Sequence, residues 1–132
     1  MPLSKSYVRT VFSLLEQGRL DDYLEQYVHP EVQWTITGTN VLSGLYVSRQ
    51  DFIDRGINKL NASLNGGIKM IIHHIFVDGD TAIVEMEAIA TAKLGHPYSN
   101  QYAWIQTFKD GKIVEARVYY DDVLVNNTIK DI

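Results

Sequence analysis

The side chains best suited to chemistry are four histidines and a set of carboxylates, because the chain has no cysteine. Without cysteine, the sequence excludes thiolate nucleophiles, disulfides and cysteine-rich zinc sites. The histidines are His29, His73, His74 and His96. Two of them are adjacent and the others are far apart in the sequence, so their spacing is not that of a metal-binding motif. We therefore predict no metal site and no cofactor.

The adjacent pair, His73 and His74, lies in a segment whose apolar residues alternate. Successive side chains of a strand point to opposite faces of a sheet, so at most one of the two can face the interior. His74 is in phase with Met70, Ile72 and Phe76, and we predict that His74 faces inward as a ligand contact. The alternative is a histidine that fills the core with its hydrogen bonds satisfied.

Aromatic side chains are the other candidates for contact with a ligand. Those that we predict to wall a flat, apolar binding pocket are Trp34, Tyr46, Trp104, Tyr119 and Tyr120. The polar atoms on the rings of Trp34, Tyr46 and Trp104 favour a cavity wall or an interface. The same sequence also fits rings that only fill a core, and this is the expected role of Phe52 and Phe108.

The composition limits the possible partners. A chain of 132 residues is expected to fold as a single domain over 1–132. It carries 12 basic and 16 acidic residues without a basic cluster, so nucleic acid is not expected as a partner. The longest apolar stretch, 68–77, is interrupted by charged and polar residues, and no membrane segment is expected. The first residues do not resemble a signal peptide, and we expect a cytoplasmic protein.

Helical spacing of apolar residues predicts three helices in the first half of the chain. The first covers 4–17 and ends at Gly18, and the second covers 20–28. The third covers 48–61, where Ser48 begins a capping box. Together these helices would provide three apolar faces that need a common surface to pack on.

Beyond the third helix the apolar residues recur every second position, which predicts strands. The predicted strands are 68–77, 82–93, 101–108 and 113–120. The inward face of 82–93 is built of small residues, which would leave space opposite a helix and form a pocket. Helices followed by an antiparallel meander indicate an α+β fold, with the helices on one side of a curved sheet.

The opposite face of this sheet is more apolar than a solvated face requires. The residues expected there are Ala103, Ile105, Thr107, Ile83 and Ile89. An apolar patch on one sheet face can be covered by its own copy in a symmetric pair. We therefore predict a homodimer through this outer face.

Several short segments, in this order and spacing, resemble the SnoaL-like proteins of the ketosteroid-isomerase-like, nuclear-transport-factor-like superfamily. The segments are 18–34, Gly38, 42–46, 77–82, 108–115 and 119–121. The resemblance extends over about 8–124, and implies a cone-shaped α+β barrel with three N-terminal helices packed on a curved, mainly antiparallel sheet. It also implies a deep apolar pocket and a homodimer.

Within this resemblance, the positions of the steroid isomerase's catalytic residues fall on Val11, Thr35 and Trp104, which cannot supply that chemistry. The polyketide-cyclase branch carries its general acid/base aspartate at the position of Asp121. That branch also places polar partners on the preceding strand, where Gln106 and Asn100 are available but no histidine is. The alternative for Asp121 is a solvated aspartate in a turn.

The predicted function is that of a SnoaL-like protein that binds a small apolar ligand, cyclic ligands included, in a deep pocket. It would perform cofactor-free acid/base chemistry of the cyclase or isomerase type with Asp121. The alternative is a non-catalytic ligand-binding or dimeric scaffold domain of the same fold. Whether the protein is an enzyme is left open by the sequence.

Overall fold

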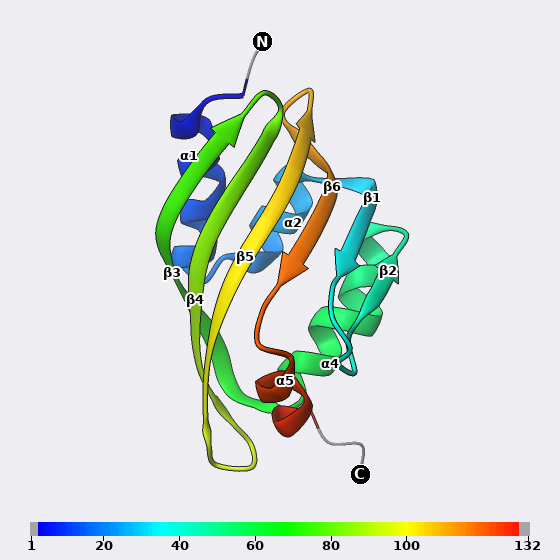
Figure 1. Cartoon of the computed structure of the whole chain (residues 1–132), viewed down its shortest axis with the longest axis vertical. Helices are drawn as coiled ribbons and strands as arrows, with labels where there is room; N and C mark the ends of the chain where they lie inside the picture. Colours follow the sequence, from blue (N-terminus) through cyan, green and yellow to red (C-terminus); the bar gives the residue numbers. More distant parts are fainter. Residues whose placement is uncertain (1–2, 130–132) are drawn as a thin grey trace.

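The computed structural model describes residues 3–129. Its elements, in chain order, are α1 (Lys5–Glu16), α2 (Leu20–Tyr27), β1 (Val28–Ile36), β2 (Gly44–Tyr46), α3 (Arg49–Asp51), the π-helical segment η1 (Phe52–Ile57), α4 (Asn58–Asn61), β3 (Leu64–Asp78), β4 (Thr81–Ala92), β5 (Pro97–Lys109), β6 (Lys112–Tyr119) and α5 (Asp122–Thr128). Figure 1 shows β3, β4 and β5 as long bent strands, with α1 and α2 behind the sheet.

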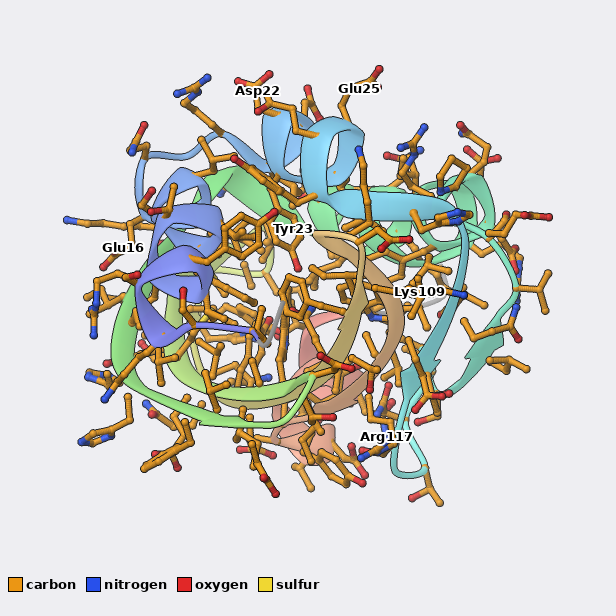
Figure 2. The ribbon with its side chains drawn as sticks, turned by 90° about the horizontal axis from the view of Figure 1, so that it is seen from above. Glu16, Asp22, Tyr23, Glu25, Lys109 and Arg117 are labelled. Carbon is orange, nitrogen blue, oxygen red and sulfur yellow. The ribbon has the colours of Figure 1, made fainter. Side chains whose placement is uncertain are left out.

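The six strands form one sheet in the order β2-β1-β6-β5-β4-β3. All neighbouring strands are antiparallel except β1 and β6, which are parallel. The sheet curves around α1 and α2 when the molecule is viewed from above (Figure 2). The predicted α+β class and cone-like shape are confirmed, but the sheet is open, with β2 and β3 at its edges, and does not close into a barrel.

The predicted helices form for the reasons that their sequences indicate. The Ser4 hydroxyl caps α1 by accepting the Tyr7 N–H, and Val8 and Val11 are fully buried on its inward face. The third helical segment begins where Ser48 accepts the Asp51 N–H. Its middle widens into a π-helix, a feature that apolar spacing does not reveal.

The faces predicted for β4 and β5 are also confirmed. Side chains at even positions of both strands are buried, including Ala82, Ala88 and Trp104, except Ala90, which is half-buried. Side chains at odd positions point to the outer face, where Ile83 and Ile89 are partly exposed. This alternation follows from the pleat of two long strands that pair with each other without a shift in register.

The predicted inward orientation of His74 is wrong. The pairing of β3 with β4 shifts between Ile72 and His74, so a bulge resets the alternation. Beyond the bulge Ile75 faces the core with 2% exposure, whereas the His74 side chain is 65% exposed. The His74 ring nitrogen Nδ1 lies 3.2 Å from a Glu85 carboxylate oxygen on the outer face.

The segment after β1 is tied to the C-terminal helix through Asp122. The Asp122 carboxylate accepts the Thr39 N–H at 3.0 Å and an Asn40 amide hydrogen at 2.7 Å. Gly38 lies directly against this carboxylate and has a φ of +88°. A side chain at Gly38 would therefore meet both a strained backbone and the Asp122 oxygens.

We expect Gly38→Ala to lower the free energy of unfolding by clearly more than Gly79→Ala. Gly79 also has a positive φ, of +61°, but an added Cβ there meets nothing within 4 Å. The control should cost only the left-handed backbone penalty, about 1–2 kcal/mol. Urea denaturation of both variants measures the difference, and equal losses would contradict the role given to the Asp122 contacts.

Candidate functional site

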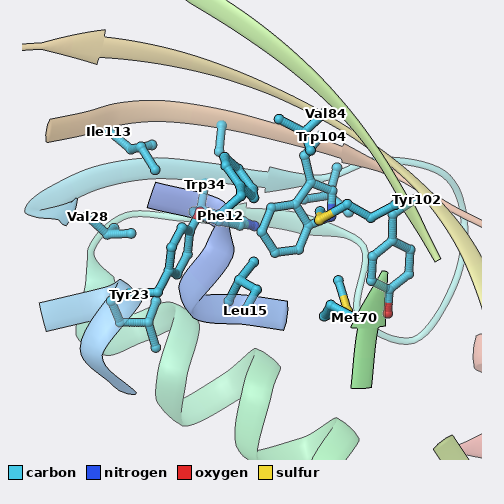
Figure 3. Packing of buried hydrophobic residues seen from close by; sticks show 14 of the residues in the cluster. Phe12, Leu15, Tyr23, Val28, Trp34, Met70, Val84, Tyr102, Trp104 and Ile113 are labelled. Carbon is cyan, nitrogen blue, oxygen red and sulfur yellow. The ribbon is translucent and has the colours of Figure 1, made fainter. Parts of the chain in front are cut away.

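A cavity of about 750 Å³ lies between the concave face of the sheet and the helical segments. Its wall includes six aromatic side chains, which are Tyr23, Trp34, Phe52, Tyr102, Trp104 and Tyr120. Aliphatic residues from α1, β1, η1, α4, β3 and β6 complete the wall. Figure 3 shows Tyr23, Trp104 and Tyr102 in one region, with Leu15 and Met70 beside them.

The aromatic wall is held rigid by ring-to-ring contacts. Trp34 stacks on Phe52 with ring centroids 4.2 Å apart, and meets Trp104 edge-on at 5.3 Å. Trp104 in turn stacks on Tyr102 at 6.0 Å. Such pairs add roughly 0.5–1.5 kcal/mol each beyond the burial of their surface. The cavity is therefore preformed, and a ligand would meet a fixed aromatic surface.

Charged groups of the described wall are confined to the start of α2, from its N-cap Arg19 to Asp22. Arg19 and Asp22 form an ion pair of 2.8 Å there, and their side chains are 50% and 45% exposed. Asp21 lies beside them, and no histidine belongs to the described wall. These exposed residues mark the opening of the cavity, so a ligand inside it contacts mainly rings and aliphatic groups.

The space does not come from the small-residue strand that the sequence pointed to. No residue of β4, which is described in full, belongs to the wall. Its Ala82 and Ala88 side chains are fully buried in the core. The cavity lies instead against residues of β1, β3, β5 and β6, on the side of the sheet that faces the helical segments.

The family of the chain follows from comparison with known proteins. The model of the SnoaL-like domain matches residues 8–116. The chain belongs to the SnoaL-like domain family. A curated relative, the dimerizing cyclase phiC of Fungal sp. (strain ATCC 74256), is 24% identical over 133 residues, which cover 98% of this chain. The chain spans only 58% of the length of that relative.

Solved structures share the fold of this SnoaL-like chain. An NTF2-like protein from Burkholderia thailandensis E264 superposes with a TM-score of 0.79 and 18% identity, covering 96% of both chains. TerC, crystallized with polyporic acid, gives a TM-score of 0.76 and 19% identity over 96% of this chain and 97% of its own. These likenesses establish the fold of the domain.

Three of the predicted ligand contacts line the SnoaL-like cavity: Trp34, Trp104 and Tyr120. Tyr46 is buried in the layer behind, where its hydroxyl donates to the Leu42 carbonyl at 2.6 Å. Tyr119 is 44% exposed, and like His74 it is absent from the described wall. Because consecutive positions at the end of a strand point to opposite sides, only one of Tyr119 and Tyr120 can face the cavity, and it is Tyr120.

Asp121 does not line the cavity. Its side chain is exposed and caps α5 by accepting the Leu124 N–H at 3.1 Å. The short helix α5 was absent from the predicted elements, so this capping role was not foreseen. The proton-transfer role of Asp121 therefore stays a prediction, which any catalytic account must reconcile with the cap.

Asn100 and Gln106 are fully buried on the concave face of β5. Asn100 lies next to Asp121, but it binds the Asp121 backbone, accepting the N–H at 2.9 Å. Gln106 donates to the Tyr23 hydroxyl at 2.8 Å, beneath the cavity wall. Both amides thus join secondary-structure elements together.

The sequence analysis did not identify two tyrosines of this region of the SnoaL-like domain. Tyr98 and Tyr102 lie on the concave face of β5, and their hydroxyl oxygens are 3.1 Å apart. Burial raises the pKa of both phenols, so both are neutral hydrogen-bond donors at ordinary pH. Tyr98 was missed because β5 begins at Pro97, within a segment predicted to be a loop. The signal was the polar tip on every second residue from Tyr98 to Gln106.

Three buried side-chain polar atoms lack a hydrogen-bond partner among residues 3–129. They are Nε1 of Trp34, Nε1 of Trp104 and Oε1 of Gln106. Leaving such an atom unpaired costs about 1–3 kcal/mol.

Two further findings concern residues 3–129 alone. No group of three or more metal-ligating side chains occurs among them. None of their helices is both long enough and apolar enough to span a bilayer.

Proposed function

We propose that this SnoaL-like protein binds a mostly apolar, ring-containing small molecule in the cavity. The observation that carries the proposal is the aromatic-walled space of about 750 Å³ whose charged groups stay at its opening. Small-molecule sites commonly have volumes of roughly 300–1,000 Å³ and walls of this composition. Flat rings in the wall favour a ligand that is itself flat, since stacked rings need a planar partner.

In the enzyme form of this proposal, the protein performs cofactor-free acid/base chemistry of the cyclase or isomerase type, with Asp121 transferring the proton. Support comes from the SnoaL-like family and from the cyclase relative. Asp121 is also linked to the cavity, because Asn100 contacts both its backbone and the Tyr98 hydroxyl. The relative is longer than this chain, so its activity is part of the proposal only.

The second candidate is a binding domain of the same fold that performs no reaction. A specific observation favours it: the exposed Asp121 carboxylate is engaged in capping α5, and the carboxylates in the described cavity wall are those of Asp21 and Asp22 at the opening. A proton-transfer group must reach the reacting atom within hydrogen-bond distance. Binding and catalysis are therefore separate questions for experiment.

For assembly, we propose that a second copy of the chain covers the outer face of the sheet. Phe76, Ile83 and Ile105 lie side by side across β3, β4 and β5. Phe76 is 53% exposed and Ile83 is 37% exposed, which is unusual for large apolar side chains in a row. A two-fold axis would pack this row against its own copy and remove it from water.

The binding proposal predicts that native mass spectrometry of freshly purified protein reveals a copurified small molecule. It also predicts that the fluorescent probe 1-anilinonaphthalene-8-sulfonate binds in the cavity. Ile68→Trp, which enlarges a residue of the wall, should weaken probe binding by about tenfold or more, equivalent to 1.4 kcal/mol. Lys69→Trp adds the same ring at the neighbouring exposed position and should leave binding unchanged. Equal affinity of both variants would place the probe elsewhere.

For Asp121, the enzyme form predicts that Asp121→Asn reduces turnover of a verified substrate by about 100-fold or more. Asparagine is also a good helix cap, so this variant should keep the stability of the parent. Asp121→Ala removes the cap as well and should cost about 1 kcal/mol. Turnover and urea denaturation are measured on the same variants. If Asp121→Asn turns over the substrate as fast as the parent, the proton-transfer role is wrong and Asp121 only caps α5.

The dimer proposal predicts a species of twice the chain mass in sedimentation at micromolar concentration. Ile83→Lys places a charge in the centre of the apolar row and should produce monomers. Val123→Lys adds the same charge to an exposed apolar residue of α5 and should not. A parent protein that sediments as a clean monomer would rule the interface out.

A further inference from the structure

A chain of buried hydrogen bonds runs along β5 from the start of α5 to the cavity. It begins at Asn100, whose side-chain oxygen accepts the Asp121 N–H at 2.9 Å. The Asn100 amide group lies 3.4 Å from the Asp121 carbonyl oxygen, so both sides of one peptide segment are bound. These two contacts fix the orientation of the amide, because the reversed amide would oppose donor to donor.

With the Asn100 amide fixed in this orientation, the Tyr98 hydroxyl proton has only one available acceptor. Asn100 donates an N–H to the Tyr98 oxygen at 3.1 Å, so that oxygen already acts as an acceptor. Tyr98 is fully buried, and its other hydrogen-bond contact is the Tyr102 hydroxyl at 3.1 Å. If Tyr102 were the donor, the Tyr98 proton would be left unpaired in the dry core. Tyr98 is therefore the donor to Tyr102.

The remaining unpaired proton belongs to Tyr102, which lines the cavity. Its oxygen accepts from Tyr98, and its own proton has no acceptor among residues 3–129. Figure 3 shows the Tyr102 ring extending from β5 toward Met70, another residue of the wall. The chain of donors thus ends on a hydroxyl at the surface of the space that a ligand would fill.

We propose that Tyr102 donates a hydrogen bond to an acceptor oxygen of the bound ligand, and that Asn100 and Tyr98 are positioning residues that direct its proton into the cavity. This inference rests on the proposed function and narrows its ligand class. The ligand is an apolar ring system that carries a carbonyl oxygen or the enolate oxygen derived from it. Hydrogen bonds aligned in one direction strengthen one another, so Tyr102 is a better donor than an isolated phenol.

The other polar groups near the cavity do not compete for this role. The Tyr120 hydroxyl donates its hydrogen bond to the Asn40 side-chain oxygen at 3.0 Å. Nε1 of Trp34 and Nε1 of Trp104 are buried within the wall itself. Arg19, the cation of the wall, is half exposed and paired with Asp22 at the opening. A ligand oxygen deep in the cavity therefore meets a neutral donor and no cation, which suits a carbonyl better than a carboxylate.

The test compares two probes of the same ring system, 9-fluorenone, which carries a carbonyl group, and fluorene, which has a CH2 group in its place. Calorimetry gives the affinity of each probe for the parent protein, Tyr102→Phe and the control Tyr27→Phe, whose ring lies outside the cavity wall. In Tyr102→Phe, we expect the ratio of ketone to hydrocarbon affinity to fall roughly 3- to 10-fold, the usual effect of one neutral hydrogen bond. Tyr27→Phe should keep the parent ratio.

The infrared carbonyl stretch of bound 9-fluorenone separates donation from mere packing. We expect a lower frequency in the parent than in an apolar solvent, the apolar-solvent value in Tyr102→Phe, and an intermediate value in Tyr98→Phe. The last shift reports positioning, because Tyr98 does not touch the ketone. Tyr102→Phe leaves the Tyr98 proton without an acceptor, which lowers the free energy of unfolding. The double variant Tyr98→Phe/Tyr102→Phe removes that proton. It should give the same affinity ratio and the same carbonyl frequency as Tyr102→Phe.

An unchanged ratio and an unchanged carbonyl frequency in Tyr102→Phe would overturn the role of Tyr102 while leaving ligand binding intact. A Tyr98→Phe frequency equal to that of the parent would overturn the positioning role. If neither probe binds the parent protein, the proposed binding function fails, and the inference about Tyr102 fails with it.

Discussion

The structure depends on hydrogen bonds made by two amide side chains that are buried on the concave face of β5. This strand carries a polar tip on successive inward residues, and Asn100 and Gln106 are fully buried. At one end Asn100 binds the backbone at the start of α5, and at the other Gln106 binds Tyr23 of α2. Because an unpaired buried amide is costly, these bonds fix where two distant helices sit against the sheet.

The same strand explains why a cavity remains in the interior. Long antiparallel strands curve, and helical segments are too straight to follow the whole concave face. Aromatic rings from β1, β5 and η1 pack against one another in the cavity wall, as Trp34 does on Phe52. A wall supported in this way stays open without a ligand, which reduces the entropy lost when a ligand binds.

The SnoaL-like fold leaves the chemistry undecided, because function resides in the groups that a particular cavity presents. Here the charged groups lie at the opening, and the interior offers rings and a tyrosine hydroxyl. Asp121 and the cavity are connected through Asn100, Tyr98 and Tyr102 rather than by direct contact. A change at Asp121 can therefore reach the site through hydrogen bonding even where its carboxylate does not touch a ligand.

The sequence alone determined the α+β class, the three helical segments, the two faces of β4 and β5 and the family, because each rests on local periodicity, caps or motif order. Trp34, Trp104 and Tyr120 line the cavity, and their contact with a ligand stays a prediction. Only the tertiary structure decided the orientation of His74, since a bulge resets the alternation of β3. It alone also showed the parallel pairing of β1 with β6, the capping role of Asp121 and the contact between Tyr98 and Tyr102. Pairing register, sheet curvature and hydrogen bonds between distant residues arise from long-range contacts, which no local pattern of residue types encodes.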